Sequence, residues 1–262
     1  MLNFCSLYSG SSGNCLYVES ENTRLLIDAG VSLKKIETGL AQLEVSPTSI
    51  DGILVTHEHS DHIQSLGNLS KKFNLPVFAN SETFDAMPKQ TDKISTENIN
   101  KFKNKEKFSI KDIEITPFDI PHDAANPCGF NISSKDDKIS IATDIGHITN
   151  EILKQLEGSK FILLESNYDT EVLKMSRYPF LLKQRIAGPN GHLSNDTASK
   201  VINYLIKSNL QTAMLGHLSK ENNFPELAYQ TVVNEILDSG NDVSKLNLSV
   251  ASRDSIGKLI HI

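Results

Sequence analysis

The feature that most constrains this chain is an apolar, β-branched run that ends in residues of the kinds that bind metals. Residues 53–55 are followed by His57, His59, Asp61 and His62. Alternate residues of an extended segment point the same way, so the rings of His57 and His59 can reach one cation. Asp61 and His62 fall where a helix would start, and they can turn to a second cation. Imidazole and carboxylate suit Zn²⁺, Mn²⁺ or Fe. The pattern therefore indicates a metal site, and the alternative interpretation is a His-rich surface loop.

Length and composition predict an ordinary soluble protein. The 262 residues are 39% hydrophobic and 22% charged, which is typical of a globular chain with a substantial core. The N-terminus shows no secretory signal, and no apolar run is long enough to cross a membrane. Cys5, Cys15 and Cys128 lack Cys-x-x-Cys spacing and are expected to be free thiols in a reducing cytoplasm. A zinc role for Cys15 and Cys128 stays open.

The charge pattern argues against a protein that coats nucleic acid by bulk electrostatics. The net charge is −6, although basic residues cluster locally at positions 71–72, 101–107 and 177–185. Each cluster taken alone is better interpreted as a solvated face.

Hydrophobic periodicity predicts two β-rich halves with helices outside. Strands are expected at residues 4–8, 15–19, 24–27, 50–56, 76–79, two within 108–118, 130–133, 138–142, 161–164, 212–215 and 246–250. Helices are expected at residues 32–43, 63–73, 149–156, 195–207 and 225–237, with Ser32 as an N-cap. Residues 80–107 allow no assignment. This pattern predicts one α/β domain over residues 1–262, with two sheets flanked by helices.

Further candidate ligands lie at the ends of predicted strands or just before a helix. They are His122, Asp144, His192 and His217. Strand ends hold side chains rigidly at one rim of a sheet, where catalytic groups commonly collect. Taken singly, each has a structural explanation, such as a surface loop for His122, a helix N-cap for Asp144 or a buried structural role for His217. Two cations require ligands of this number and kind, which favours the metal interpretation.

The loop at residues 9–14 is short and rich in Ser and Gly. Its polar members are Ser9, Ser11, Ser12 and Asn14. It is either a flexible turn or a lip of N–H groups and hydroxyls that can approach an anion, and the sequence favours neither.

With these residues in view, the chain resembles the metallo-β-lactamase-fold hydrolases, and within them the YycJ (WalJ) group of bacterial proteins. The His57-x-His59-x-Asp61-His62 motif matches the central motif of that superfamily. The more specific matches are the segments SGSSGNC (9–15), LIDAG (26–30), TDIG (143–146), LESNYD (164–169), GHLSN (191–195) and HLSxxNN (217–223).

The resemblance implies a four-layer αβ/βα sandwich with a site for two divalent metal ions, Zn or Mn with Fe as a further candidate. His57, His59 and His122 would hold one ion, Asp61, His62 and His217 the other, and Asp144 would bridge them. It also implies a 5′→3′ exonuclease that acts on DNA in mismatch repair. The segment between Asp144 and His192 is too short for the large cap domain of β-CASP nucleases, and the chain has no Gly/Pro-rich arm for tRNA.

The hypothesis for the reaction is phosphodiester hydrolysis by a hydroxide shared between the two ions, because paired cations lower the pKa of bound water. Asp61 would orient this nucleophile or take its proton. His192 would hydrogen-bond the phosphate or protonate the leaving oxygen, although a purely structural role is the alternative. Ser9, Ser11, Ser12 and Asn14 would line the substrate side, and Tyr168 or Asn222 would contact the DNA strand.

Other functions remain open on the same residues. A hydrolase of a small ester, thioester, lactam or cyclic phosphodiester would use the same fold, since fold does not settle substrate. A di-iron redox protein is disfavoured, because such relatives generally carry an acidic ligand where this chain has His59. A non-catalytic regulatory module is disfavoured by the complete ligand set. An exposed apolar surface could also support a homodimer.

Overall fold

The N-terminal hairpin continues into a run of parallel strands, and together they form a mixed sheet. The computed structural model describes residues 1–262. The strands of this sheet are β1 (Asn3–Tyr8), β2 (Cys15–Glu19), β3 (Arg24–Ile27), β4 (Gly52–Leu54), β5 (Val77–Asn80), β6 (Ile99–Phe102) and β14 (Ile260–His261). Their order is β14-β1-β2-β3-β4-β5-β6. The pairs from β14 to β3 are antiparallel, and those from β3 to β6 are parallel.

The second sheet also has seven strands and mixed pairing. They are β7 (Phe108–Ile110), β8 (Ile113–Asp119), β9 (Cys128–Ser134), β10 (Asp137–Ala142), β11 (Phe161–Glu165), β12 (Thr212–Gly216) and β13 (Asn247–Val250). Their order is β13-β12-β11-β10-β9-β8-β7. Strands β7 to β9 are antiparallel, whereas β10 to β13 are parallel. Parallel strands bring their carboxyl ends to one edge, which is where α/β proteins commonly bind ligands.

Ten α-helices accompany the sheets. They are α1 (Leu33–Gln42), α2 (Ser60–Ile63), α3 (Leu66–Phe73), α4 (Ser81–Ala86), α5 (Pro88–Thr91), α6 (Asn150–Leu156), α7 (Thr170–Met175), α8 (Phe180–Ile186), α9 (Asn195–Leu205) and α10 (Pro225–Asp238). Ser32 caps α1 as predicted, because its side chain accepts a hydrogen bond from the Lys35 N–H. No helix is both long enough and apolar enough to span a bilayer.

The predicted helix at residues 63–73 is interrupted. Helix α2 ends at Ile63 and α3 begins at Leu66, so the segment is two helices instead of one. Ser65, between them, donates from its backbone N–H to Ala29 O (2.9 Å) and from its hydroxyl to Val31 O (2.6 Å). These tertiary hydrogen bonds compete with continuation of the helix, which the local hydrophobic pattern could not indicate.

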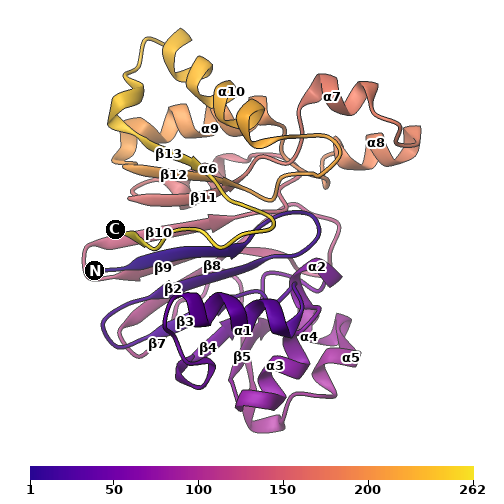
Figure 1. Ribbon diagram of the computed structural model, residues 1–262, viewed down its shortest axis with the longest axis vertical. Coiled ribbons are helices and arrows are strands. Elements are labelled where there is room, and N and C mark those ends of the chain that lie inside the picture. Colours follow the sequence, from indigo (N-terminus) through magenta and orange to yellow (C-terminus); the bar gives the residue numbers. More distant parts are fainter. The chain divides into compact units, whose positions relative to one another are not determined.

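The chain divides into two compact units. Unit 1 comprises Met1–Asp119, Ala124–Asp137 and Ser252–Ile262, and unit 2 comprises Ile120–Asp123 and Lys138–Ala251. In unit 1, α1 and α3 pack on the sheet that carries β1 to β5 (Figure 1). Ile36, Leu40, Leu66 and Leu69 are fully buried there. Burial of such a side chain contributes about 1.5–3 kcal/mol. The prediction of a single domain stays a prediction.

The core of unit 2 is built around the central parallel strand β11. β11 pairs in parallel with β10 and β12, and Phe161, Ile162, Leu163 and Leu164 are all fully buried, as expected for a parallel strand of a sheet covered on both faces. Helices α9 and α10 lie side by side (Figure 1) and are joined by hydrogen bonds from Asn203 to residues of α10 and its C-cap. The buried and paired strand β11 therefore holds its carboxyl end in a fixed position.

Candidate functional site

Strands β3 and β4 end side by side, and the polar residues that follow them form the first part of the candidate site. Ile27 is aligned with Leu54 in the parallel register. Asp28, next after β3, accepts hydrogen bonds from the backbone N–H and the hydroxyl of Thr56, both at 2.9 Å. Asp28 has φ = +62°, a left-handed conformation that residues other than glycine seldom adopt. Such a conformation at a strand end often marks a functional position.

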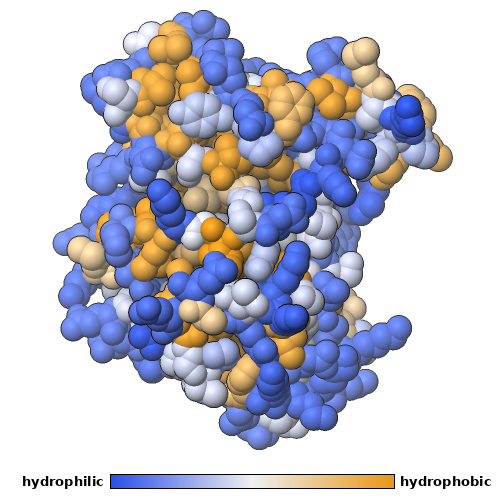
Figure 2. All heavy atoms as spheres, in the orientation of Figure 1, coloured by the Kyte–Doolittle hydropathy of each residue, from blue (hydrophilic) through white to orange (hydrophobic).

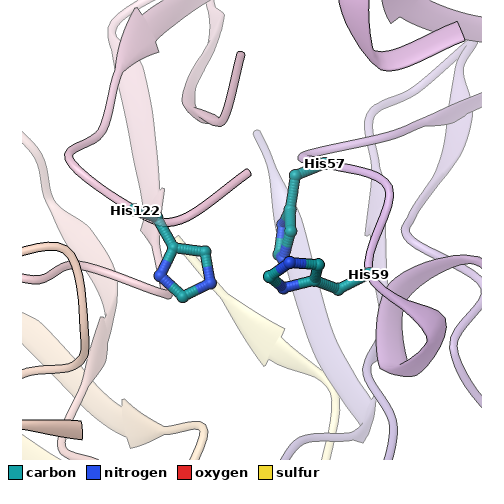
Figure 3. A group of neighbouring side chains, drawn as sticks. All are labelled: His57, His59 and His122. Atoms are coloured by element: carbon teal, nitrogen blue, oxygen red, sulfur yellow. The ribbon is translucent and has the colours of Figure 1, made fainter. Parts of the chain in front are cut away.

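The three histidines of the motif in unit 1 converge. The ring centroids of His57 and His59 are 4.6 Å apart, and those of His57 and His62 are 4.1 Å apart. Figure 3 shows the rings of His57 and His59 close together. His57 and His62 are buried, whereas His59 and Asp61 are half-buried. His57 and His59 therefore lie close together, although both follow the end of β4 and belong to no strand, and Asp61 and His62 lie in α2, at the helix start predicted there.

The orientation of the His62 ring is set by its neighbours. Because the Asp28 carboxylate accepts, His62 Nδ1–H is the donor in their 2.7 Å hydrogen bond. His62 Nε2 then carries the lone pair, and the Asn14 amide lies 3.2 Å from it. Asp61 Oδ2 lies 3.6 Å from the same Nε2. A carboxylate on the far nitrogen is the usual partner of a metal-ligating histidine, since it fixes the tautomer and raises ligand basicity.

The loop at residues 9–14 is held against the motif. The Asn14 N–H donates to Asp61 O (2.8 Å), and the Asn14 Oδ1 accepts from Gly10 N–H (3.0 Å). A Cβ at Gly30 would lie 1.6 Å from Asp61 O, so only glycine permits this close approach. Ser9 and Asn14 are buried, whereas Ser11 and Ser12 are exposed.

These contacts make Asn14 a support of the motif. The predicted contact of Ser9, Ser11, Ser12 and Asn14 with substrate stays a prediction, and the exposed Ser11 and Ser12 are the members that a substrate can reach.

In unit 2 the candidates follow three parallel strands. Ala142, Leu164 and Leu215 are aligned across β10, β11 and β12, so the residues just beyond them meet at one edge. Asp144 and His217 lie there with φ values of +61° and +55°. Ligand atoms of four residues fall within 4.8 Å of one another: Asp144, Glu165, His192 and His217. The parallel register thus gathers residues that are far apart in the sequence.

Glu165, the last residue of β11, is the centre of this group. Its Oε1 accepts from Nδ1 of His217 (2.7 Å) and of His192 (2.8 Å). Its Oε2 accepts from the backbone N–H groups of Ile145 (2.8 Å) and Leu193 (3.0 Å). Burial raises the pKa of the Glu165 carboxyl, but the two imidazoles outweigh burial and bring the pKa to about 2. Glu165 is therefore a carboxylate that orients His192 and His217.

Sequence reasoning did not single out Glu165 or Asp28 as functional residues. A signal for Glu165 was present, because it ends an otherwise apolar strand, FILLE. Acidic side chains are almost never fully buried unless they are paired. A carboxylate in such a strand therefore predicts a buried cationic or donor partner. The partners themselves could not be read from the sequence.

The pKa values of His122 and His192 are shifted in opposite directions. His122 extends from the loop after β8 (Figure 3), and its Nδ1–H donates to Gly191 O at 3.1 Å. Burial lowers the pKa of His122, which keeps the imidazole neutral, as a metal ligand must be. Burial also lowers the pKa of His192, but the Glu165 carboxylate outweighs it, and the net pKa is raised. The side chain of His192 is 19% exposed, so it remains accessible.

The two other predicted substrate contacts, Tyr168 and Asn222, lie in unit 2. Tyr168 is mostly buried, and its carbonyl accepts from Asn195 N–H at 2.8 Å. Asn222 is fully buried. Its side-chain amide donates to the Ser219 hydroxyl at 3.2 Å, and its backbone carbonyl accepts from Asp169 N–H at 2.9 Å. Asn222 thus fastens two loops, and its contact with a substrate stays a prediction.

The cysteines are free and buried. They are Cys5, Cys15 and Cys128. Burial raises the pKa of each thiol, for Cys5 to about 11. The groups of residues whose ligand atoms come together consist of His, Asp and Glu alone. A zinc role for Cys15 and Cys128 therefore receives no support.

The comparisons with known proteins agree with this geometry. A family model described as the β-lactamase superfamily domain matches residues 23–217. Exodeoxyribonuclease YycJ of Bacillus anthracis is 38% identical over 91% of this chain and 90% of its own length. Exodeoxyribonuclease WalJ of Streptococcus pneumoniae is also 38% identical, over 88% of this chain and 86% of its own.

Solved structures confirm the predicted fold class. The metallo-β-lactamase fold protein YhfI from Bacillus subtilis matches with a TM-score of 0.71 and 15% identity, covering 100% of both chains. Zn²⁺-bound PqqB from Methylobacterium extorquens matches with a TM-score of 0.72 and 13% identity, covering 99% of this chain and 100% of its own. At these identities the likeness concerns the fold, whereas the two exodeoxyribonucleases define the family. The chain belongs to the metallo-β-lactamase superfamily of hydrolases, in the group of the YycJ and WalJ proteins.

Proposed function

We propose that the protein is a metal-dependent exodeoxyribonuclease that removes nucleotides from the 5′ end of DNA. The observation that carries this proposal is the 38% identity to YycJ, named an exodeoxyribonuclease, over nine-tenths of both chains. The 5′→3′ direction rests on the resemblance to the YycJ group. The three buried free cysteines fit a protein of a reducing compartment, and we place the enzyme in the cytoplasm.

The proposed metal ligands are the two sets described above. His57, His59 and His122 would hold one divalent ion, Asp61, His62 and His217 would hold the second, and Asp144 would be shared. The chemistry of the donors fits such ions, because neutral imidazoles and carboxylates are ligands for Zn²⁺ and Mn²⁺, with Fe as a third candidate. The Nδ1 atoms of His62, His122 and His217 each donate to an oxygen acceptor, which sets the tautomer in which Nε2 is the basic nitrogen of the ring.

When bound, a pair of divalent ions would supply a hydroxide nucleophile at neutral pH and polarise a phosphoryl oxygen. The residues of the chain supply the rest. Asp61, at the start of α2, would orient the nucleophile or accept its proton. The Glu165 carboxylate raises the pKa of His192, which favours a role for its imidazole in hydrogen-bonding the phosphate and protonating the leaving oxygen. On the substrate side, Ser11 and Ser12 present exposed hydroxyls.

The test is digestion of end-labelled DNA. Single- and double-stranded oligonucleotides, with and without a 5′-phosphate, are incubated with protein reconstituted in Mn²⁺ or Zn²⁺, and metal content is measured by mass spectrometry. Stepwise release of mononucleotides from the 5′ end, abolished by chelation and in Asp61→Ala, is the expected result. Mononucleotide release from the 3′ end would overturn the direction alone. No cleavage by protein that holds two ions per chain would overturn the nuclease function.

A further inference from the structure

The hairpin of helices α7 and α8 carries an unusual concentration of exposed apolar side chains. Met175 is 86% exposed, Phe180 71% and Leu181 77%, and all three lie within seven residues of unit 2. Figure 2 shows hydrophobic and strongly hydrophilic residues next to one another on this hairpin. Clustered exposed apolar groups rimmed by polar ones commonly mark a binding site.

A hollow of about 480 Å³ lies at the base of the hairpin. Its walls include the aromatic residues Tyr168, Tyr178 and Phe180, together with Leu173 and Ala187. The lining is largely apolar, and the volume is within the range of small-molecule sites. Three aromatic side chains around one hollow offer π-faces for a flat, unsaturated ring.

The charges around the hollow favour an anionic chain. Four basic residues lie on the hairpin: Lys174, Arg177, Lys183 and Arg185. Lys174 is paired with Glu171 at 2.7 Å and Arg185 with Asp123 at 2.6 Å. Lys183 donates to a backbone carbonyl instead of a carboxylate, and Arg177 is exposed and has no ion pair. Arg177 and Lys183 are thus cations that a phosphate can still neutralise.

The hollow is joined through backbone and side chains to the candidate site of unit 2. Ile186 O, at the end of α8, accepts from His192 N–H at 2.9 Å. Tyr168 forms a β-bridge with Ser194, two residues beyond His192. Arg185 of α8 binds Asp123, the neighbour of His122. A ligand in the hollow would therefore be held at a fixed offset from His122 and His192.

We infer that this hollow is a base-binding subsite, in which an unstacked nucleobase of the DNA substrate lies against Tyr178 and Phe180 while flanking phosphates bind Arg177 and Lys183. The inference rests on the proposed function and names the form of its substrate: a single-stranded stretch beside the scissile phosphate. Aromatic rings interleaved with cations are the usual means of holding single-stranded nucleic acid, because every base has a π-face. A purely apolar partner would leave Arg177 and Lys183 without an anionic partner.

The experiment measures binding of a fluorescent single-stranded phosphorothioate oligonucleotide, which resists hydrolysis, to the metal-loaded protein. Phe180→Ala should weaken binding about 5- to 160-fold, the usual range for loss of one base–aromatic stack. It should raise the KM for single-stranded DNA. It should leave kcat for bis(p-nitrophenyl) phosphate unchanged, because that compound is too small to occupy both the candidate active site and the hollow. Arg177→Ala should reduce the slope of log K against log salt by about 0.7.

Matched controls come from unit 2 itself. Leu237→Ala removes a side chain that is 57% exposed on α10, and Lys200→Ala removes an exposed charge from α9. Both should bind the oligonucleotide as the wild type does. Phe180 is so exposed that its replacement should leave the unfolding transition in place, which circular dichroism checks.

The outcomes separate the subsite from the function. Equal oligonucleotide binding by wild type and Phe180→Ala, in a protein that degrades DNA, overturns the subsite and leaves the function standing. A wild type that neither binds nor degrades DNA overturns the function. If Phe180→Ala leaves DNA binding intact but abolishes self-association in sedimentation, the hairpin binds a second copy of the chain. If it leaves DNA binding intact but abolishes flotation with phosphatidylglycerol vesicles, the hairpin binds a lipid surface. Either outcome overturns the subsite.

Discussion

Glu165 Oε1 and His217 Nδ1 form a 2.7 Å hydrogen bond between two fully buried side chains. The same oxygen binds His192 Nδ1, so one carboxylate orients a proposed metal ligand and a proposed acid together. An ionised carboxylate in a dry setting is costly unless every lone pair is used, and four donors use those of Glu165. We expect this residue to control metal binding and proton transfer without touching either the metal or the substrate.

Glu165→Gln is expected to weaken metal binding and activity about 10- to 100-fold, the usual effect of losing the carboxylate behind a ligating imidazole. The amide keeps the size of the side chain but has one acceptor oxygen and no charge for four donors. Metal content after dialysis against graded chelator, measured by mass spectrometry, checks the loss. Glu226→Gln, at an exposed position on α10, is the matched control. Wild-type metal retention in Glu165→Gln would refute the role.

His192→Ala should keep its metal content and lose about 10²- to 10⁴-fold in kcat, the scale of general acid catalysis. The reason is that His192 is partly exposed and Glu165 raises its pKa, whereas burial lowers the pKa of His122, as suits a metal ligand. Metal analysis alongside steady-state kinetics makes the distinction. Loss of an ion would instead show that His192 is a metal ligand.

Asp61→Ala should abolish turnover even in preparations that retain some metal. Asp61 lies in the first turn of α2 with its carboxylate 3.6 Å from His62 Nε2, so it is placed to serve both a cation and the nucleophile. Turnover per bound ion is the quantity to compare with the wild type. Normal turnover per ion would eliminate Asp61 from the chemistry.

The free energy of unfolding should depend on pH partly through Lys138. Its ammonium donates to Gln155 O (2.6 Å) and Glu157 O (2.8 Å) at the end of α6. Burial lowers the pKa of Lys138 from 10.5 to about 8, against a smaller opposing effect of Glu157. Between these values the unfolded chain binds more protons, so this group makes the folded state more stable as pH rises from about 8 to 10.5.

The check is urea unfolding of wild type and Lys138→Met at several pH values in that window. The free energy of unfolding should rise less with pH in Lys138→Met than in the wild type. Comparison with the variant cancels the cysteines and tyrosines that titrate nearby. Parallel pH profiles for the two proteins would show that the pKa of Lys138 is not lowered on folding.

The three thiols should be inert in the folded protein. Cys5 and Cys15 are fully buried, Cys128 is 1% exposed, and burial raises the pKa of each, so thiolate is scarce at neutral pH. Ellman's reagent should react with none of them in native protein and with three after unfolding in guanidinium. Rapid reaction of one thiol in native protein would mean that its burial is transient.

Much of the fold could be predicted because its patterns are local. Three examples depend on residues only a few positions apart: the apolar run of β11, the N-cap Ser32 of α1 and the closeness of His57 to His59. The break between α2 and α3 was missed, because the partners of Ser65 lie more than thirty positions away. Residues 80–107, which allowed no assignment, form short elements whose polar surfaces carry little periodic signal.

The sequence by itself determined which residues are proposed to bind metal, since His57, His59, Asp61, His62, His122, Asp144 and His217 are of ligand type and stand after strands or at a helix start. Only the tertiary structure decided how these groups are oriented. Asp28 meets His62 across 34 positions and Glu165 meets His217 across 52, through parallel registers that no local pattern encodes. A buried charge must find its partners in space, and the strand register decides which residues those are.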